Sequence, residues 1–251
     1  MRFTFLGTGT SDGVPMIACD CAVCKSRDRR DVRTRTSAMI EHEGRVILID
    51  ASFDMREQML RENVKRLDAI LLTHPHADHV FGLDDLRQLN RITGTMPVYC
   101  NRLGVAEIHE RFGYFFNPKQ RGGGVSQIEL RETTRPFTLF GLRVVPLPVK
   151  HGILDILGYR IGDMSYITDA SFIPDAVVRA ARGSRVLVLN ALRYRKHSTH
   201  FSLQEAVDMA TRIGAERTYF VHFTHDVKHA ELAKELPRGM MPAYDGLRLT
   251  L

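Results

Sequence analysis

Three histidines and one aspartate stand within six residues of the sequence, in His74-Pro75-His76-Ala77-Asp78-His79. The apolar run 69–72 directly before them predicts a short buried strand that ends in a polar turn. Imidazole nitrogens and carboxylate oxygens are ligands that zinc, iron and manganese accept, and a strand end can hold them close together. The motif therefore predicts a catalytic metal site, against the alternative of a solvated cluster of surface histidines.

Three further polar residues stand at the ends of apolar runs that predict strands, namely His151, Asp169 and His222. A loop at such a place would line a pocket, although a lone histidine there is more often structural. A site for two metal ions needs more ligands than one short motif can supply. Together with the histidine motif, these residues are consistent with a dinuclear site.

The elements that must position these residues alternate between strands and helices along the whole chain. Glu43-Gly44 predicts a β-hairpin between two of the strands, and Ser202 with Glu205 predicts a capping box at the start of a helix. We expect one α/β domain over residues 1–251, built from two similar halves. The predicted strands are 2–7, 37–42, 45–50, 69–72, 97–100, 128–130, 137–140, 142–149, 156–161, 165–168, 186–189, 218–221 and 247–251, and the predicted helices are 53–63, 84–89, 103–112, 175–182, 202–213 and 228–235.

The composition bounds the class of protein. The 251 residues are 44% hydrophobic and 25% charged, as in ordinary globular proteins, and no apolar run is long enough for a transmembrane helix. The N-terminal residues read as a first strand and not as a signal peptide, so we expect a cytoplasmic protein without a membrane partner. The net charge of +6 suggests an anionic partner. Four cysteines in such a chain favour metal or thiolate roles over disulfides.

Three segments allow two interpretations each. The glycines of 7–13 resemble a dinucleotide-binding loop, but no predicted helix follows, so we expect them to let backbone approach the floor of a site. The arginine-rich run 27–35 reads as a solvated loop or short helix, or else as a rim that collects anions. The segment 113–125 reads as a packed surface loop, or else as a loop whose aromatic side chains cover a substrate.

Taken together, the motifs resemble those of the metallo-β-lactamase-fold hydrolases, whose pattern is H-x-H-x-D-H followed by a later His, Asp and His. The resemblance covers essentially the whole chain and implies an αββα sandwich of two mixed β-sheets flanked by helices. It implies that one metal is bound by His74, His76 and His151, that the other is bound by Asp78, His79 and His222, and that Asp169 bridges them, with Asp50 in support. Flavodiiron oxidoreductases of this fold carry an acid where this chain has His76, which disfavours that branch.

The N-terminal cysteines indicate which members of this superfamily the chain resembles most. Cys19-x-Cys21-x-x-Cys24 supplies three thiolates that are too close together to pair comfortably with one another, and a tetrahedral zinc ion wants a fourth ligand. His225 lies three residues after His222 and could supply it. The same pattern occurs in the PhnP-type cyclic phosphodiesterases, which the chain resembles most, and in PqqB-type proteins. We therefore expect a structural zinc on these four residues, with three buried free thiols as the alternative and Cys100 in the core.

By resemblance to the PhnP-type enzymes, His200, just before the helix 202–213, would serve as a catalytic acid or phosphate contact; His197 lacks that match. Arg193 could hold a phosphate oxygen with its planar guanidinium or else be solvated, and Asp245 resembles a supporting residue near the end of that family. Asp78 would orient water and ligands. Two metals would lower the pKa of bound water to near neutrality and so provide a bridging hydroxide at neutral pH.

We therefore expect a phosphoric diester hydrolase that acts on small or cyclic phosphodiesters, with two active-site Mn²⁺ or Zn²⁺ ions, Fe²⁺ being a third option, and one structural Zn²⁺. A tRNA 3′-processing type of endonuclease is the first alternative, but the chain has no long basic arm with which to grip tRNA, so nucleic acid is not the favoured partner. A PqqB-like protein without a clear hydrolytic role is the second. A homodimer is an open option.

Overall fold

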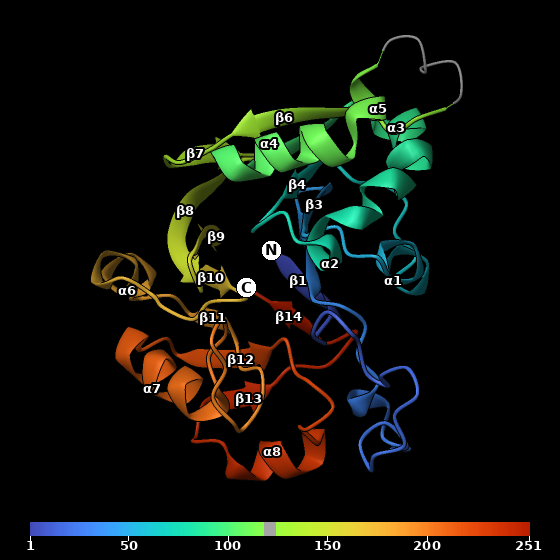
Figure 1. The fold of residues 1–251 in the computed structure, drawn as a ribbon. Coiled ribbons are helices and arrows are strands. Elements are labelled where there is room, and N and C mark those ends of the chain that lie inside the picture. Colours follow the sequence, from blue (N-terminus) through green and yellow to red (C-terminus); the bar gives the residue numbers. More distant parts are fainter. Residues whose placement is uncertain (118–123) are drawn as a thin grey trace. The chain divides into compact units, whose positions relative to one another are not determined.

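The computed structural model describes residues 1–117 and 124–251 (Figure 1). The chain forms two compact units. Unit 1 comprises residues 1–6, 37–134 and 248–251, and unit 2 comprises residues 7–36 and 135–247. Each unit contains one seven-stranded β-sheet. Among the described residues, none of the helices combines the length and the apolar character that crossing a membrane would need.

The sheet of unit 1 has the strand order β14-β1-β2-β3-β4-β5-β6. It is mixed, because β14 is antiparallel to β1 and β2 is antiparallel to β3, whereas β3, β4, β5 and β6 run parallel to one another. The final strand lies at the edge, as predicted. The bounds are β1 (Arg2–Gly7), β2 (Ser37–His42), β3 (Arg45–Ile49), β4 (Ala69–Leu71), β5 (Met96–Cys100), β6 (Ile128–Glu132) and β14 (Arg248–Thr250).

The predicted hairpin is confirmed. β2 and β3 pair in the register His42 with Arg45 through Ala38 with Ile49. The turn residues Glu43 and Gly44 both have positive φ, 48° and 74°. Two consecutive positive φ angles are the mark of the turn that matches the twist of a hairpin, which is why a glycine stands there.

The helices of unit 1 depart from the prediction at two places. The predicted helix at 84–89 is part of a longer helical stretch, because the polar motif already turns into a helix at Ala77. The first residues of the predicted loop 113–125 form a short helix, and Phe115 is buried, which favours a packed role; residues 118–123 lie outside the described residues. The bounds are α1 (Met55–Arg61), α2 (Ala77–Val80), the 3₁₀ helix η2 (Phe81–Leu86), α3 (Arg87–Thr93), α4 (Arg102–Arg111) and α5 (Gly113–Phe116).

The sheet of unit 2 has the order β13-β12-β11-β10-β9-β8-β7. Strands β7 to β10 pair antiparallel and β10 to β13 pair parallel. The prediction missed β13, a three-residue strand that includes Pro242 and lies at the sheet edge, where a proline is tolerated. The bounds are β7 (Phe137–Leu139), β8 (Leu142–His151), β9 (Leu154–Ile161), β10 (Met164–Ile167), β11 (Val186–Asn190), β12 (Arg217–Val221) and β13 (Met240–Pro242).

The helices of unit 2 pack on its apolar core through residues such as Val177 of α6 and Ala206 of α7. The predicted capping box at α7 is present, with the backbone N–H of Ser202 donating to the Glu205 carboxylate at 2.9 Å. The bounds are the 3₁₀ helix η1 (Arg29–Asp31), α6 (Asp175–Ala181), α7 (Leu203–Ile213) and α8 (His229–Glu235).

The prediction that the arginine run is solvated is wrong for Arg33. Its side chain is fully buried and donates to the equally buried Asp31 carboxylate at 3.1 Å. A charged side chain enters a protein interior when a partner of opposite charge is buried with it. The other interpretation of the glycines at 7–13, a dinucleotide-binding loop, is excluded: within the described chain no helix begins between Gly13 and Arg29.

Candidate metal centre

In unit 1, two neighbouring parallel strands bring the first group of predicted ligands to one edge. β3 and β4 pair with Ile49 opposite Leu71, so the residues that follow each strand meet at the same end of the sheet. Asp50 follows β3 and is fully buried. Its carboxylate accepts hydrogen bonds from Thr73 N and Thr73 Oγ1, both at 2.8 Å, and lies 2.8 Å from His79 Nδ1. Asp50 therefore orients the His79 ring.

Burial is the largest influence on Asp50 and raises its pKa, while His79 and Thr73 oppose that shift. The residue also has a positive φ of 63°, and its carbonyl oxygen accepts a hydrogen bond from Ser37 Oγ at 2.7 Å. Backbone strain of this kind persists where the surrounding structure over-determines it, commonly at functional sites.

The other predicted ligands of unit 1 crowd around the start of α2. His74 Nε2 lies 3.0 Å from His76 Nδ1, and His79 Nε2 lies 3.3 Å from Asp78 Oδ2. His74 Nδ1 contacts Thr73 Oγ1 at 2.9 Å. All four side chains are buried or nearly so. The nitrogen and oxygen atoms of the motif thus converge, as a metal site requires.

In unit 2, Asp169 is the centre of the second group. It follows β10, and His222 follows β12, two strands that run in the same direction in one sheet. Asp169 Oδ2 lies 3.3 Å from His222 Nε2 and 3.2 Å from His200 Nε2. Ligand atoms of His151, Asp169 and His200 all lie within 4.8 Å of one another. His151 is the last residue of β8 and does not follow the strand as predicted.

Asp169 and His222 share the unusual backbone of Asp50, with positive φ angles of 59° and 65°. Side chains other than glycine rarely adopt this conformation, and it costs of the order of 1–3 kcal/mol at each position. Three strand ends that carry predicted site residues are therefore strained. Sequence reasoning missed this feature, since the residue types alone do not reveal it.

The imidazoles are anchored through Nδ1 by oxygen atoms of the fold. His151 Nδ1 lies 2.7 Å from the Thr199 carbonyl oxygen, and His222 Nδ1 lies 3.1 Å from Thr36 Oγ1. A carbonyl oxygen only accepts hydrogen bonds, so His151 Nδ1 carries the proton and its Nε2 presents a lone pair. Metal-binding histidines in proteins are held in this way. The donor set therefore fits divalent transition metals.

His200 lies between Asp169 and His197. Its Nε2 faces Asp169, while its Nδ1 lies 3.0 Å from Thr199 Oγ1 and 3.2 Å from His197 Nδ1. Burial and the neighbouring His200 lower the pKa of His197. Sequence reasoning ranked His197 below His200 because it lacks a counterpart in the resemblance; the structure places the two rings in contact.

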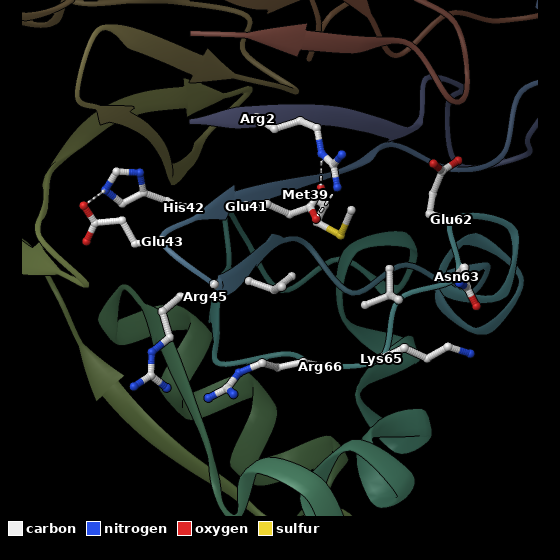
Figure 2. A pocket seen from close by; sticks show the side chains of 13 residues that line it. Arg2, Met39, Glu41, His42, Glu43, Arg45, Glu62, Asn63, Lys65 and Arg66 are labelled. Atoms are coloured by element: carbon white, nitrogen blue, oxygen red, sulfur yellow. Dashed lines mark hydrogen bonds and ion pairs between the residues drawn. The ribbon is translucent and has the colours of Figure 1, made fainter.

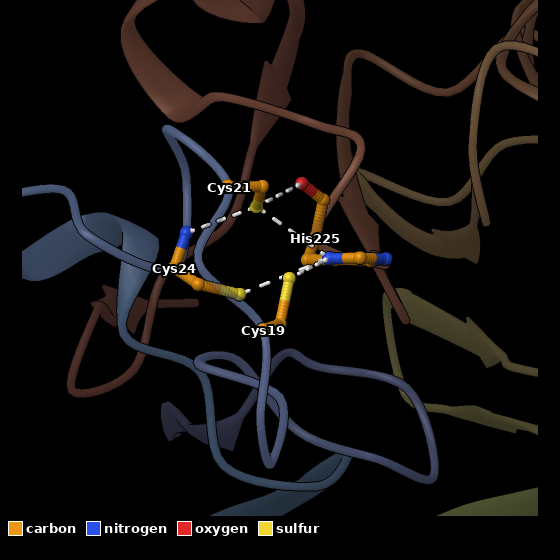
Figure 3. A group of neighbouring side chains, drawn as sticks. All are labelled: Cys19, Cys21, Cys24 and His225. Carbon is orange, nitrogen blue, oxygen red and sulfur yellow. Dashed lines mark hydrogen bonds between the residues drawn. The ribbon is translucent and has the colours of Figure 1, made fainter.

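The cysteine cluster is brought together as predicted (Figure 3). His225 Nδ1 lies 3.1, 3.5 and 3.8 Å from the sulfur atoms of Cys19, Cys21 and Cys24. The Cys24 backbone N–H points at the Cys21 sulfur, which lowers the pKa of Cys21 to about 6. Burial raises the pKa of Cys24 to about 11. Three sulfurs and one imidazole nitrogen form the donor set of a closed zinc site, and a bound cation would favour all three thiolates.

Asp245 and Arg193, which the sequence predicts to support the site, both lie in unit 2. The Asp245 carboxylate accepts hydrogen bonds from Thr8 Oγ1 at 2.8 Å and from the backbone N–H and hydroxyl of Thr34 at 2.8 and 2.6 Å, so it ties three segments together. Arg193 borders a cavity of about 180 Å³ that Thr10 and His225 also line. Arg193 Nε is buried and has no hydrogen-bond partner among the described residues.

A sizeable cavity lies away from the predicted metal ligands. It has a volume of about 610 Å³ and lies in unit 1, where charged side chains such as Arg2, Glu41 and Lys65 surround it (Figure 2). The Arg2 guanidinium pairs with the Glu41 carboxylate across its wall. None of the predicted metal ligands lines this cavity. The chemistry of the side chains, and not cavity size, therefore identifies the candidate site.

The chain is similar in sequence and in structure to known proteins of one fold. The family model "Beta-lactamase superfamily domain" matches residues 45–223. The crystal structure of a new diphosphatase from the PhnP family is 44% identical, with a TM-score of 0.93 over 100% of this chain and 97% of that one. Zn²⁺-bound PqqB from Methylobacterium extorquens is 21% identical, with a TM-score of 0.81 over the full length of both chains.

Among curated proteins, an octanoyltransferase from Porphyromonas gingivalis is 41% identical over 254 residues, which cover 98% of this chain and 51% of that protein. The chain thus spans about half the length of this curated relative. The matches bear out the expected metallo-β-lactamase fold, with two mixed seven-stranded sheets flanked by helices, and the closeness to PhnP.

Proposed function

The chain belongs to the metallo-β-lactamase superfamily, and on that premise we propose that it is a metal-dependent phosphodiesterase acting on small or cyclic phosphodiesters. The position of the His200 ring beside Asp169 is the main support for this proposal. Its Nε2 lies 3.2 Å from the Asp169 carboxylate, so an imidazole additional to the predicted ligand set stands beside that set. Hydrolysis of a diester needs such a group, because the departing alkoxide must receive a proton.

We assign the ligands as the motif order of the family implies. His74, His76 and His151 would hold one ion, Asp78, His79 and His222 the other, and Asp169 would bridge. Divalent Mn, Zn or Fe bound by these residues would neutralise phosphate charge and lower the pKa of bound water to near neutrality. The four cluster residues Cys19, Cys21, Cys24 and His225 would hold a separate structural zinc.

The roles of the chain's own residues follow from their contacts. Asp50 orients the His79 ring through Nδ1, and the Thr199 carbonyl orients His151. His200 is held at Nδ1 by Thr199 and His197, and its Nε2, which lies beside Asp169, would deliver a proton to the leaving oxygen. Arg193 can donate to a phosphate oxygen through its planar guanidinium.

The likeness to a diphosphatase of the PhnP family supports phosphoryl chemistry. Acyl transfer, suggested by the octanoyltransferase relative, would commonly use an activated thiol as nucleophile. Three cysteines of this chain gather around His225, and burial raises the pKa of the fourth, Cys100, to about 12. A zinc ion on the first three would hold their thiolates as ligands, so none of the four thiols is favoured as a nucleophile.

The test is His200→Ala, assayed on bis(p-nitrophenyl) phosphate with the metal content measured in parallel. Turnover should fall by about 10²-fold or more while the metals stay bound, since removing a general acid costs about that much. His197→Ala is the matched control and should lose less. Asp169→Ala should lose turnover together with at least one metal. Unchanged turnover in His200→Ala would sink the assignment.

A second arm separates the alternatives within the superfamily. A tRNA-processing enzyme would cleave precursor tRNA far better than small diesters, and its activity would fall steeply with salt, because many phosphate contacts release counterions. A preference for small diesters that does not depend on salt supports the proposal. A chain that binds only one zinc and hydrolyses no diester would instead match a PqqB-like protein.

A further inference from the structure

Two exposed phenylalanines flank the metal-binding motif in unit 1. The side chains of Phe53 and Phe81 remain 48% and 38% exposed. Their ring centroids are 5.0 Å apart with an interplanar angle of 87°, an edge-to-face arrangement. Phe53 stands three residues after Asp50, and Phe81 stands two residues after His79. Each ring therefore follows a residue of the candidate site within its own segment, a turn for Phe53 and the start of η2 for Phe81.

The two segments are held together by backbone hydrogen bonds. The Ala51 N–H donates to the His79 carbonyl at 2.8 Å, and the Gly82 N–H donates to the Ala51 carbonyl at 2.9 Å. A Cβ at Gly82 would lie 2.2 Å from the Ser52 carbonyl oxygen, so only glycine permits this approach. The buried Phe112 ring supports Phe81, with centroids 5.7 Å apart. The fold therefore brings the two rings together through backbone contacts of their segments and through Phe112.

The pair also lies next to a predicted metal ligand. The Phe81 N–H donates to the Ala77 carbonyl, which closes one helical turn over residues 77–81. Residues three apart on such a turn share a face, so Asp78 and Phe81 are neighbours. Side chains at this spacing have Cβ atoms about 5–6 Å apart. A molecule whose phosphate approaches Asp78 can place its next group against Phe81.

We propose that Phe53 and Phe81 form a stacking platform for a planar ring, such as a nucleobase, carried by the substrate. The proposal rests on the proposed phosphodiesterase function and deepens it by naming the substrate class, a phosphodiester with a nucleoside on one side. Aromatic side chains stack on any base because every base presents a π face. An aliphatic or simple sugar substituent would gain much less from two aromatic rings.

The experiment compares the binding of AMP and of ribose 5-phosphate to the metal-loaded protein by calorimetry. The two ligands share the phosphoribosyl group and differ by the base, so the ratio of their Kd values isolates the contribution of the ring. We expect AMP to bind about 5- to 100-fold more tightly, the range that one base–aromatic stack gives. Phe53→Leu and Phe81→Leu should bring the ratio towards one, because they keep apolar bulk and remove the ring.

Two further variants control the result. Phe81→Tyr keeps an aromatic face and should retain the AMP preference. Ile92→Ala truncates a more exposed apolar side chain, 57% exposed, on α3 and should leave the ratio unchanged. A ratio near one in the unmodified protein, or a ratio that survives Phe81→Leu, would overturn the platform.

The readout separates this inference from the proposed function. Binding is measured without turnover, so a base-dependent Kd in a protein that cleaves no diester would support the platform and refute the phosphodiesterase. Hydrolysis of bis(p-nitrophenyl) phosphate without any base preference would do the reverse. If the Phe81→Leu variant sediments as a smaller species than the unmodified protein and keeps the Kd ratio, the pair would instead contact a second copy of the chain. That result would overturn the proposal.

Discussion

Arg33 offers the sharpest test of how unit 2 holds the loop that carries His222 and His225, two predicted metal ligands. Its guanidinium donates to the Asp31 carboxylate and to the Thr224 carbonyl oxygen, both at 3.1 Å, and lies 5.1 Å from the centre of the Phe223 ring. Phe223 and Thr224 stand between His222 and His225, one predicted ligand of each metal site. We expect Arg33→Met to destabilise the protein and to loosen this loop.

The magnitude follows from the burial of both charges. The side chains of Arg33 and Asp31 are 0% exposed, and burial lowers the pKa of Arg33 while the Asp31 carboxylate opposes that shift. Removing the guanidinium leaves a buried carboxylate that still accepts a hydrogen bond from the His229 N–H at 2.7 Å. Breaking a buried ion pair in this way typically costs ~3–5 kcal/mol. For a chain of this length, that corresponds to a fall in Tm of roughly 6–20 °C.

The assay is urea denaturation of Arg33→Met beside the double variant Asp31→Asn/Arg33→Met. The double variant removes both charges and keeps the amide oxygen that can accept from His229, so it should recover most of the loss. Zinc content of the single variant should also fall, because His225 follows the Thr224 carbonyl that Arg33 holds. A single variant that loses less than ~1 kcal/mol, or a double variant as unstable as the single one, would refute the reasoning.

Two further predictions concern unit 2. Burial and the nearby Arg30 and Arg33 lower the pKa of His229 to about 4. An unfolded histidine titrates near ~6.5, so the unfolded state takes up the proton first and stability is lost as pH falls from about 6.5 to 4, by about 2 kcal/mol at pH 5. The free energy of unfolding, measured by urea denaturation, should therefore be lower at pH 5 than at pH 7, and His229→Gln should remove that part of the decrease. An unchanged decrease in the variant would show that His229 does not cause it. Cys21→Ser should lose zinc and stability more than diester turnover, as elemental analysis and assay together can show; normal folding and zinc content with lost turnover would move the cysteines into the active site.

Much of the fold was predictable because its signals are local. The hairpin at Glu43-Gly44, the capping box of Ser202 and Glu205 and most strand positions depend on residues a few positions apart. The boundaries that failed involve a polar motif that turns helical at Ala77 and a proline-containing edge strand ending at Pro242. In both cases tertiary packing overrides the local propensity.

The chemistry of the candidate site was also legible in the sequence. Histidines, aspartates and cysteines at characteristic spacings predict their own donor types, whatever surrounds them. The tertiary structure decided what holds them. The Thr199 carbonyl sets the tautomer of His151 from 48 residues away, and Thr36 anchors His222 from 186 residues away. Pairings at such separations leave no local pattern, because many oxygens along the chain could serve equally well.

The same distinction explains Arg33 and the aromatic pair. The sequence presents Arg33 as one arginine in a basic run, yet its contact with Thr224, 191 residues away, draws it into the interior. Phe53 and Phe81 read as separate apolar residues, and only the fold shows that Gly82 lets their two segments approach. The sequence by itself determined which residues can bind metal. How deeply these residues are buried, which backbone angles are strained and which side chains lie next to them depend on how distant segments pack. Only the tertiary structure decided these properties.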